Sequence, residues 1–232
     1  MHVPDGFLDV PTSVATGVVA AAAVGVALRG ARRELDDRTA PLAGLVATFV
    51  FAAQMINFPV GAGTSGHLMG GALAAVLVGP WTGILCLSVV LLVQALLFAD
   101  GGITALGTNV VLIGVVGVVV GTLVFRGLQA VLPKRVSLVA PLAAVGALLS
   151  VPVASLVFVG LYAVGGAAPV PLDDLAAAMV GWHTLIGVGE AVITGLVVGS
   201  IVAVRPDLVH GARRVLARRP VELRTAPAEA AA

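Results

Sequence analysis

The chain has 232 residues, of which 59% are hydrophobic and 11% are charged, and its formal net charge is +1. Soluble domains carry about 25% charged residues, so a mean hydropathy of +1.10 excludes a soluble globular fold and predicts a multi-pass protein embedded in a lipid bilayer. The near-neutral net charge gives no reason to expect a nucleic-acid partner.

The first segment, residues 1–7, is too short to span a membrane, but it contains a chelating set of nitrogen atoms. The α-amine of Met1, the backbone nitrogen of His2 and the Nδ1 atom of the His2 ring together close two fused chelate rings on one cation. Flat nitrogen fields suit Ni(II), Cu(II) and, in some sites, Co(II). A fourth nitrogen has to come from elsewhere, and His67 is the candidate. The alternative is a disordered chain end that carries a histidine by chance.

Apolar segments predict an all-α membrane protein with about seven transmembrane helices in one bundle, within a membrane domain of residues 1–204. A metal-binding tail (1–10) and a metal-site loop (57–67) belong to this domain. The segment 67–79 barely crosses the hydrocarbon at about 1.5 Å per residue, and we expect a span that begins late, after a structured loop. The predicted helices are 12–28, 41–57, 67–79, 82–98, 108–125, 137–164 and 178–204.

The basic residues predict the orientation of the chain in the membrane. All 13 Lys and Arg residues fall in three segments, 29–38, 126–135 and 205–224. Seven spans place these three segments on one side, which is the cytoplasm by the positive-inside rule. The N-terminus is therefore expected outside and the C-terminus in the cytoplasm, where residues 205–232 are expected to form a basic, partly disordered tail.

Polar residues gather at the expected outer ends of the helices. Such groups are costly in lipid unless they face a cavity or a partner, so their clustering predicts a site there. The Gly-rich loop 57–66 is expected to fold back into the bundle over the N-terminal tail. The residues expected to surround the metal ligands are Asn57, Thr64, Ser65, Asn109 and His183.

Two of the deeper polar residues have both a functional and a structural interpretation. His183 is either close to the metal or a structural histidine, because its spacing completes no ligand set. Glu190 is either part of an ion path or a buried acid that fixes helix packing through hydrogen bonds. The structural interpretation is favoured for each.

Several motifs together resemble the CbiM/NikM family, the substrate-binding membrane subunits of energy-coupling-factor transporters for cobalt and nickel. The resemblance runs from Met1 to about Val204 and rests on the segments 1–8 (MHVPDGFL), 54–60 (QMINFPV), 63–67 (GTSGH), 77–81 (LVGPW) and 94–102 (QALLFADGG). It implies that the Met1 amine, the amide and ring nitrogens of His2, and His67 hold the metal.

The resemblance also implies a cargo and a set of partners. The cargo is Ni(II) or Co(II), with no permanently bound cofactor, and the location is a prokaryotic cell (inner) membrane. The partners are a transmembrane coupling subunit, ATP-binding subunits and a small accessory membrane subunit. Some cobalt members have Ser-His-Pro where this chain has Gly66-His67-Leu68, so the choice between the two metals stays open.

Other classes of membrane protein fit the sequence less well. A self-sufficient divalent metal permease or channel needs polar residues along its whole path, yet between Asn109 and Phe125 the chain is almost wholly apolar residues and glycine. An intramembrane metalloprotease needs a His-Glu-x-x-His motif, which the sequence lacks. The chain has no phosphate-binding loop with a Gly-Lys-Ser/Thr ending, so ATP hydrolysis is expected only in partner subunits.

Overall fold

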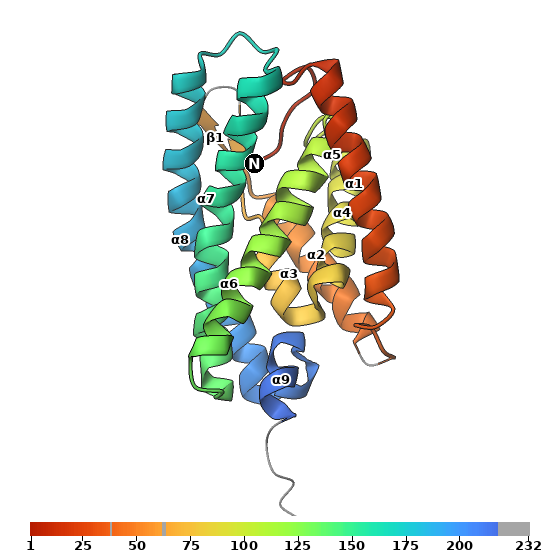
Figure 1. Cartoon of the computed structure of the whole chain (residues 1–232), viewed down its shortest axis with the longest axis vertical. Coiled ribbons are helices and arrows are strands. Elements are labelled where there is room, and N and C mark those ends of the chain that lie inside the picture. Colours follow the sequence, from red (N-terminus) through yellow and green to blue (C-terminus); the bar gives the residue numbers. More distant parts are fainter. Residues whose placement is uncertain (38, 62–63, 218–232) are drawn as a thin grey trace, which may run out of the picture.

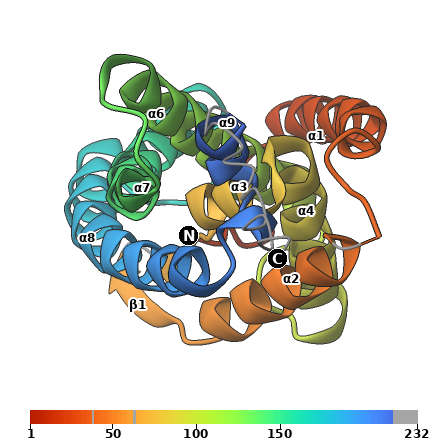
Figure 2. The same ribbon diagram turned by 90° about the horizontal axis from the view of Figure 1, so that it is seen from below.

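A computed structural model describes residues 1–37, 39–61 and 64–217, and these residues form a mostly helical bundle with one small hairpin (Figures 1 and 2). The elements in chain order are α1 (Val10–Ala31), α2 (Ala40–Gln54), β1 (Phe58–Gly61), β2 (Thr64–Gly66), α3 (Gly71–Val78), α4 (Pro80–Leu97), α5 (Leu106–Asn109), a π-helical segment (Val110–Val116), α6 (Gly117–Val131), α7 (Val139–Gly165), α8 (Leu172–Val204) and α9 (Arg213–Leu216). Short 3₁₀ turns lie at Val136–Leu138, Pro206–Leu208 and His210–Ala212.

Five helices of the described chain are long and apolar enough to cross a membrane: α1, α4, the continuous rod Leu106–Val131, α7 with its preceding turn, and α8. The helix α2 has 15 residues, which makes it shorter than a usual span. The predicted span 67–79 contains α3, which has only 8 residues, all of them buried inside the protein, so this helix is shorter than a usual span. The structure therefore supports a multi-pass membrane protein with five long spans and two shorter apolar helices.

The other predicted helices are present, with ends that move by several residues. One of the two largest shifts is at α8, which begins at Leu172, six residues before the predicted start. Asp173 and Asp174 occupy its first turn, where negative charge is favourable because of the partial positive charge at a helix N-terminus. The predicted helix 108–125 is longer than expected and contains the π-helical segment Val110–Val116, in a rod that ends at Val131.

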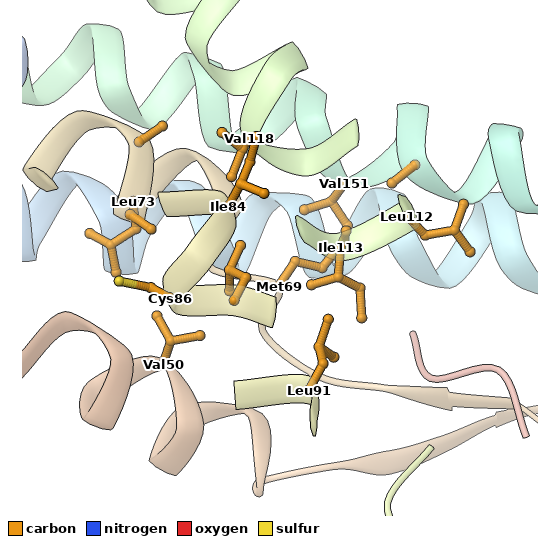
Figure 3. Close-up of a cluster of buried hydrophobic side chains, with 14 of the residues drawn as sticks. Val50, Met69, Leu73, Ile84, Cys86, Leu91, Leu112, Ile113, Val118 and Val151 are labelled. Carbon is orange, nitrogen blue, oxygen red and sulfur yellow. The ribbon is translucent and has the colours of Figure 1, made fainter. Parts of the chain in front are cut away.

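The buried helix α3 lies at the centre of the bundle, in contact with α2, α4, α6, α7 and α8 (Figure 2). Its neighbours form a core of side chains, among them Met69, Leu73, Ile113 and Val118, which meet between the helices (Figure 3). A Cβ atom on Gly71 would lie 2.7 Å from the backbone carbon of Gly117. Glycine at position 71 therefore lets α3 approach the π-helical rod closely, as small residues do between membrane helices.

A buried carboxylate sets the boundary between α3 and α4. The Glu34 side chain accepts hydrogen bonds from the backbone N–H of Thr82 (2.8 Å), the Thr82 hydroxyl (3.0 Å) and the N–H of Trp81 (3.3 Å). These groups lie in the first turn of α4, whose free amides attract an anion. Gly79, with φ of 101°, makes the sharp turn beneath this carboxylate.

The loop predicted to fold back into the bundle contains a β-hairpin. Strand β1 pairs antiparallel with β2, with Phe58 opposite Gly66 and Pro59 opposite Ser65. The hairpin lies against α8, where the rings of Phe58 and Trp182 meet edge to face with centroids 6.2 Å apart. The chain leaves β2 directly into His67, so the hairpin determines where this histidine enters the bundle.

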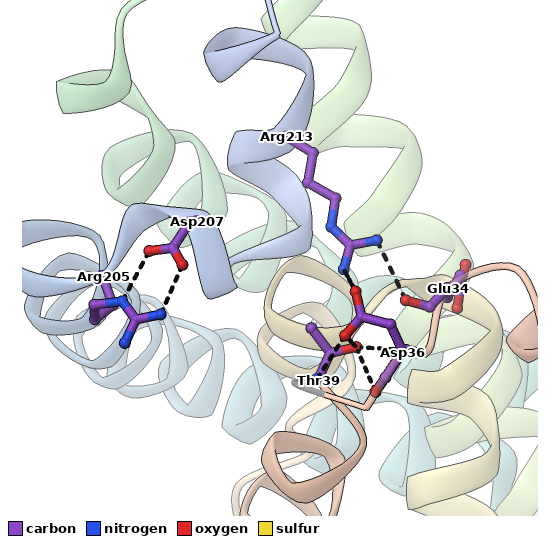
Figure 4. A network of polar contacts seen from close by, with 6 residues as sticks. All are labelled: Glu34, Asp36, Thr39, Arg205, Asp207 and Arg213. Atoms are coloured by element: carbon purple, nitrogen blue, oxygen red, sulfur yellow. Dashed lines mark hydrogen bonds and ion pairs between the residues drawn. The ribbon is translucent and has the colours of Figure 1, made fainter.

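The described parts of the three basic segments lie at one end of the bundle, where α9 is close to both the α1–α2 connection and the α6–α7 connection (Figure 1). The first part of the predicted tail is folded: Arg205 pairs with Asp207, and Arg213 contacts the Glu34 carbonyl (3.2 Å) and the Asp36 carboxylate (3.9 Å) (Figure 4). The remainder of the predicted tail, 218–232, lies outside the described residues.

Candidate metal site at the N-terminal tail

The N-terminal tail runs into the bundle, and Met1, His2 and Val3 are all buried. Asn109, at the end of α5, holds the tail in two directions. Its Oδ1 atom accepts a hydrogen bond from the Val3 N–H (2.8 Å), and its Nδ2 atom donates one to the Val3 carbonyl (3.1 Å). The N–H of Gly102 donates to the same carbonyl at 3.0 Å. The tail is therefore fixed like an added strand and does not behave as a free chain end.

Apolar residues seal the tail behind this contact. Phe7 packs between the rings of Phe158 and Tyr162 of α7, with centroids 5.9 and 5.4 Å from its own. Leu8 is also buried, in an isolated bridge with Gly166. Asp9 then caps α1 by accepting a hydrogen bond from the Thr12 N–H at 2.9 Å. These contacts hold residues 7–9 in place between the Met1 amine and the first turn of α1.

The Met1 amine and the His67 ring meet in the protein interior. The amine nitrogen lies 2.5 Å from His67 Nε2, and both residues are at most 1% exposed. His67 Nδ1 lies 2.6 Å from the Leu68 carbonyl, to which it donates. Because Nδ1 therefore carries the ring proton, the neutral ring has a free lone pair on Nε2, directed at the amine.

The His2 ring lies on top of the His67 ring. The two rings are stacked, with centroids 4.1 Å apart and an angle of 26° between their planes. His2 Nδ1 lies 3.0 Å from Asp100 Oδ1, and Asp100 Oδ2 accepts a hydrogen bond from Asn57 Nδ2 at 3.2 Å. The structure thus brings Met1, His2 and His67 together, with the predicted ligand atom Nδ1 turned to Asp100.

Burial sets the protonation of these nitrogens. It lowers the pKa of the Met1 amine from 8.0 to about 4, although the negative charges of Asp100 and Glu190 act in the opposite direction. Burial also lowers the pKa of His2, and it lowers that of His67 well below its usual value, together with the nearby amine. The three groups are therefore unprotonated near neutral pH, which is the form that binds a metal.

Asp100 balances two opposing effects. Burial raises its pKa, but the hydrogen bond and charge of His2, the hydrogen bond from Asn57 and the charge of the Met1 amine together outweigh this effect, so the pKa of Asp100 is lowered overall. Ala99 precedes it with φ of 51°, in the left-handed region, and this turn ends α4 and directs Asp100 to the tail. The sequence shows that Asp100 lies at the end of an apolar helix, but gives no sign that it faces His2.

Four of the five residues predicted to surround the ligands either contact the residues of the site or line a cleft beside it. Asn57 and Asn109 contact the site through Asp100 and Val3, and Ser65 lines a cleft of about 420 Å³ that opens beside His2 between the tail and the hairpin. Thr64 lines the same cleft, but its hydroxyl also bonds to the Gly61 carbonyl (2.9 Å) and contacts the Met179 sulfur (3.3 Å).

His183 is buried beneath this group. Its Nδ1 atom lies 2.8 Å from the Met179 carbonyl, and its Nε2 atom has no hydrogen-bond partner among the described residues. Its charge would be felt by both Met1 and His67. The structure thus places His183 near the ligands, with one nitrogen in a structural role.

Glu190 positions the segment that follows His67. Its two carboxylate oxygens accept hydrogen bonds from the N–H groups of Met69 and Gly70, each at 2.8 Å. Gly70 has φ of 77° and leads directly into α3. Glu190 therefore fixes the N-terminus of α3, which agrees with the packing role favoured from the sequence.

The described residues contain no group of three or more His, Cys, Asp and Glu side chains arranged to hold a metal ion. A metal site in this part of the chain therefore has to use the amine or backbone nitrogens beside His2 and His67. Asp5, the acid closest in sequence, is exposed and accepts hydrogen bonds from the N–H (2.7 Å) and hydroxyl (2.5 Å) of Thr104.

Comparison with known proteins gives a consistent family. Residues 2–208 match the family described as "Cobalt uptake substrate-specific transmembrane region". A putative metal transport protein of Haloquadratum walsbyi is 40% identical over 209 residues, which are 90% of this chain and 93% of that protein. A fused nickel transport protein NikMN of Rhodobacter capsulatus is 36% identical over 90% of this chain and 64% of its own length.

A cobalt transport protein CbiM of Sorangium cellulosum is 40% identical over 54% of this chain and 57% of that protein. A crystal structure described as a truncated transition metal transporter superposes with a TM-score of 0.80 at 30% identity, over 88% of this chain and 99% of that one. The match over residues 2–208 and these relatives agree with the buried N-terminal tail and the apolar bundle: the chain belongs to the CbiM/NikM family of substrate-specific membrane proteins for cobalt and nickel transport.

Proposed function

We propose that this protein captures Ni(II) or Co(II) at the N-terminal tail, as the substrate-binding subunit of an energy-coupling-factor importer. The four ligands are the Met1 amine nitrogen, the His2 amide nitrogen, His2 Nδ1 and His67 Nε2. The three basic segments face the cytoplasm, so the cleft beside His2 opens to the outside. A transmembrane coupling subunit and ATP-binding subunits supply the energy, and a small accessory membrane subunit completes the complex.

One observation carries the proposal: the Met1 amine points at the unprotonated Nε2 of His67 inside the protein, 2.5 Å away. Two nitrogens that share one ion, with bonds of about 2.0 Å at a right angle, lie about 2.8 Å apart. The two groups are thus already close to the separation that a shared cation requires. Their burial excludes the water that would otherwise compete for the ion.

His2 completes the ligand plane by exchanging Asp100 for the metal. Its ring is stacked on the ring of His67, and His2 Nδ1 has to leave Asp100 Oδ1 to bind the ion. Asp100 stays next to the incoming cation and offsets part of its charge. The resulting set of four nitrogens contains no thiolate and no carboxylate, which favours Ni(II) and Co(II) over Mg(II) and Mn(II).

Isothermal titration of the purified full-length protein with Ni(II) tests the ligand set. One extra residue before Met1 converts the amine into an amide, so we expect Ni(II) binding to be lost while the protein stays folded. His67→Ala should weaken binding severely and leave a weak site of three nitrogens. The control is His210→Ala, which removes a histidine that lines a pocket beside Phe125, Arg213 and Arg214 in the folded part of the C-terminal segment.

Two outcomes would contradict the proposal. Tight Ni(II) binding by the extended protein would exclude the amine as a ligand. Equal binding by the wild-type protein and His67→Ala would remove His67 from the ligand set. Loss of binding by His210→Ala would show that the assay reports general damage to the protein.

A further inference from the structure

We infer that a pocket at the end of the bundle opposite the metal site binds the phosphate headgroup of an anionic phospholipid. The pocket has a volume of about 460 Å³ and lies between the end of α6, the α6–α7 connection and α9. This inference does not depend on the metal ligands proposed above, because it rests on other residues at the far end of the molecule.

The polar part of the pocket is strongly basic. Arg126, Lys134, Arg135 and Arg214 line it, and none of the described residues that line it is an Asp or a Glu. Arg126 and Arg214 also line a smaller adjoining pocket of about 280 Å³. Like charges that line one pocket repel one another, and an anion bound between them reduces this repulsion.

The neighbouring arginines show that this lack of acids is specific to the pocket. Arg205 forms two hydrogen bonds with Asp207, and Arg213 contacts the Glu34 carbonyl and the Asp36 carboxylate (Figure 4). In the described ranges 1–37, 39–61 and 64–217, no ion pair joins a carboxylate to any of the four pocket cations. The protein thus neutralises the cations beside the pocket and leaves those that line it for another anion.

The apolar part of the pocket identifies the anion as a lipid. Pro133, Leu138, Val139, Leu142 and Val215 share the lining with the cations. Val131 and Leu132, where α6 ends, are 79% and 40% exposed, as expected of residues that touch acyl chains. A headgroup phosphate on the cations with its chains along these residues satisfies both parts, whereas a free phosphate satisfies only one. Basic pockets between membrane helices on the positively charged side bind anionic headgroups in this way.

Native mass spectrometry of the full-length protein in detergent tests the inference. Phosphatidylglycerol should bind more tightly than phosphatidylcholine with the same acyl chains. Arg126→Gln and Arg214→Gln should each weaken phosphatidylglycerol binding by about fivefold, since a basic residue near a membrane surface contributes about that factor. Arg32→Gln is the matched control, because Arg32 is an exposed arginine in the α1–α2 connection and lines neither pocket.

The unfolding temperature of each variant shows whether its fold is intact. Millimolar inorganic phosphate should leave phosphatidylglycerol bound, and displacement by phosphate at this concentration would show a site for a soluble anion. Equal retention of both lipids, or equal losses in Arg126→Gln and Arg32→Gln, would overturn the inference. Unchanged lipid binding in Arg126→Gln and Arg214→Gln with loss of the co-purified coupling subunit would assign the pocket to a protein partner.

Discussion

At the scale of single residues, both the ring of His67 and the backbone that follows it are held by hydrogen bonds. Its Nδ1 atom is held by the Leu68 carbonyl, and Glu190 binds the N–H groups of Met69 and Gly70 that follow it. A ligand whose second nitrogen donates to a carbonyl keeps one tautomer and one ring orientation. The lone pair of Nε2 is therefore in place before a metal arrives.

Asn109 fixes the backbone of the tail through hydrogen bonds to Val3, as Glu190 fixes the backbone that follows His67. We expect Asn109→Ala to weaken Ni(II) binding by about 10-fold to 100-fold, because it leaves the buried N–H of Val3 unsatisfied, at about 1–3 kcal/mol, and removes one of the two hydrogen bonds to the Val3 carbonyl. Titration calorimetry measures the loss. Asn57→Ala is the matched control, since Asn57 is exposed and bonds only to Asp100 in the site, and its effect should be smaller. Equal effects of the two variants would exclude Asn109 as the residue that fixes the tail.

The pH dependence of binding follows from the amine. Its pKa is 8.0 in a free tail and about 4 in the buried position. The open tail therefore binds more protons than the closed tail between these values, so docking of the tail strengthens as pH rises from about 4 to about 8. Ni(II) affinity should increase over this range and level off above it. A flat affinity between pH 5 and pH 8, measured by titration calorimetry, would exclude docking of the free amine.

At the scale of elements, α1 carries a stripe of small residues that the rest of the protein covers only in part. Gly17, Ala21 and Gly25 follow one another at intervals of one turn, and Ala21 and Gly25 are exposed. Small residues in such a stripe allow the close approach of another membrane helix. We propose that the coupling subunit docks on this face of α1.

The substitution Ala21→Leu should block co-purification with the coupling subunit while Ni(II) binding by the isolated protein persists. Ala177→Leu makes the same change at an exposed position of α8 and should leave co-purification unchanged. If Ala21→Leu loses both properties together, the stripe packs inside the protein. If Ala21→Leu still co-purifies, the face points to lipid and the docking proposal is wrong.

The elements also show where hydropathy is informative and where it is not. Apolar length predicts α4, α7 and α8, because a helix that crosses lipid must be apolar over its whole length. The same signal makes α3 resemble a span, since a helix buried in protein is as apolar as one buried in lipid. The hairpin β1–β2 and the π-helical segment leave no hydropathy signal, because tertiary contacts determine them.

The site shows a similar division. The sequence predicts Met1, His2 and His67 together from motif and chelate geometry. The structure places the Met1 amine next to His67 Nε2 and the His2 ring on the His67 ring, with His2 Nδ1 turned to Asp100. Contacts between distant residues could not be predicted: Asp100 faces His2, Asn109 holds Val3, and Glu190 binds the amides after His67. The two residues of each pair are far apart in the sequence, and only the folded structure brings them together.

At the scale of the whole molecule, the two polar regions lie at opposite ends of one apolar bundle. The tail and hairpin hold the candidate metal site at one end, and the basic segments with α9 form the other (Figure 1). Within the described part of the chain, α3 fills the centre between them with buried apolar residues. We expect metal release to the other side to require movement of this centre, driven by the coupling and ATP-binding subunits.

The absorption and magnetism of the Ni(II)-loaded full-length protein, with and without excess Zn(II), show whether four nitrogens hold the metal. Four nitrogens from Met1, His2 and His67 form a square plane, whereas Zn(II) prefers a tetrahedron. We expect the yellow-orange, diamagnetic spectrum of planar nickel, unchanged by excess Zn(II). A paramagnetic six-coordinate spectrum, or ready displacement of nickel by Zn(II), would contradict this expectation and show that oxygen ligands such as Asp100 replace part of the nitrogen plane.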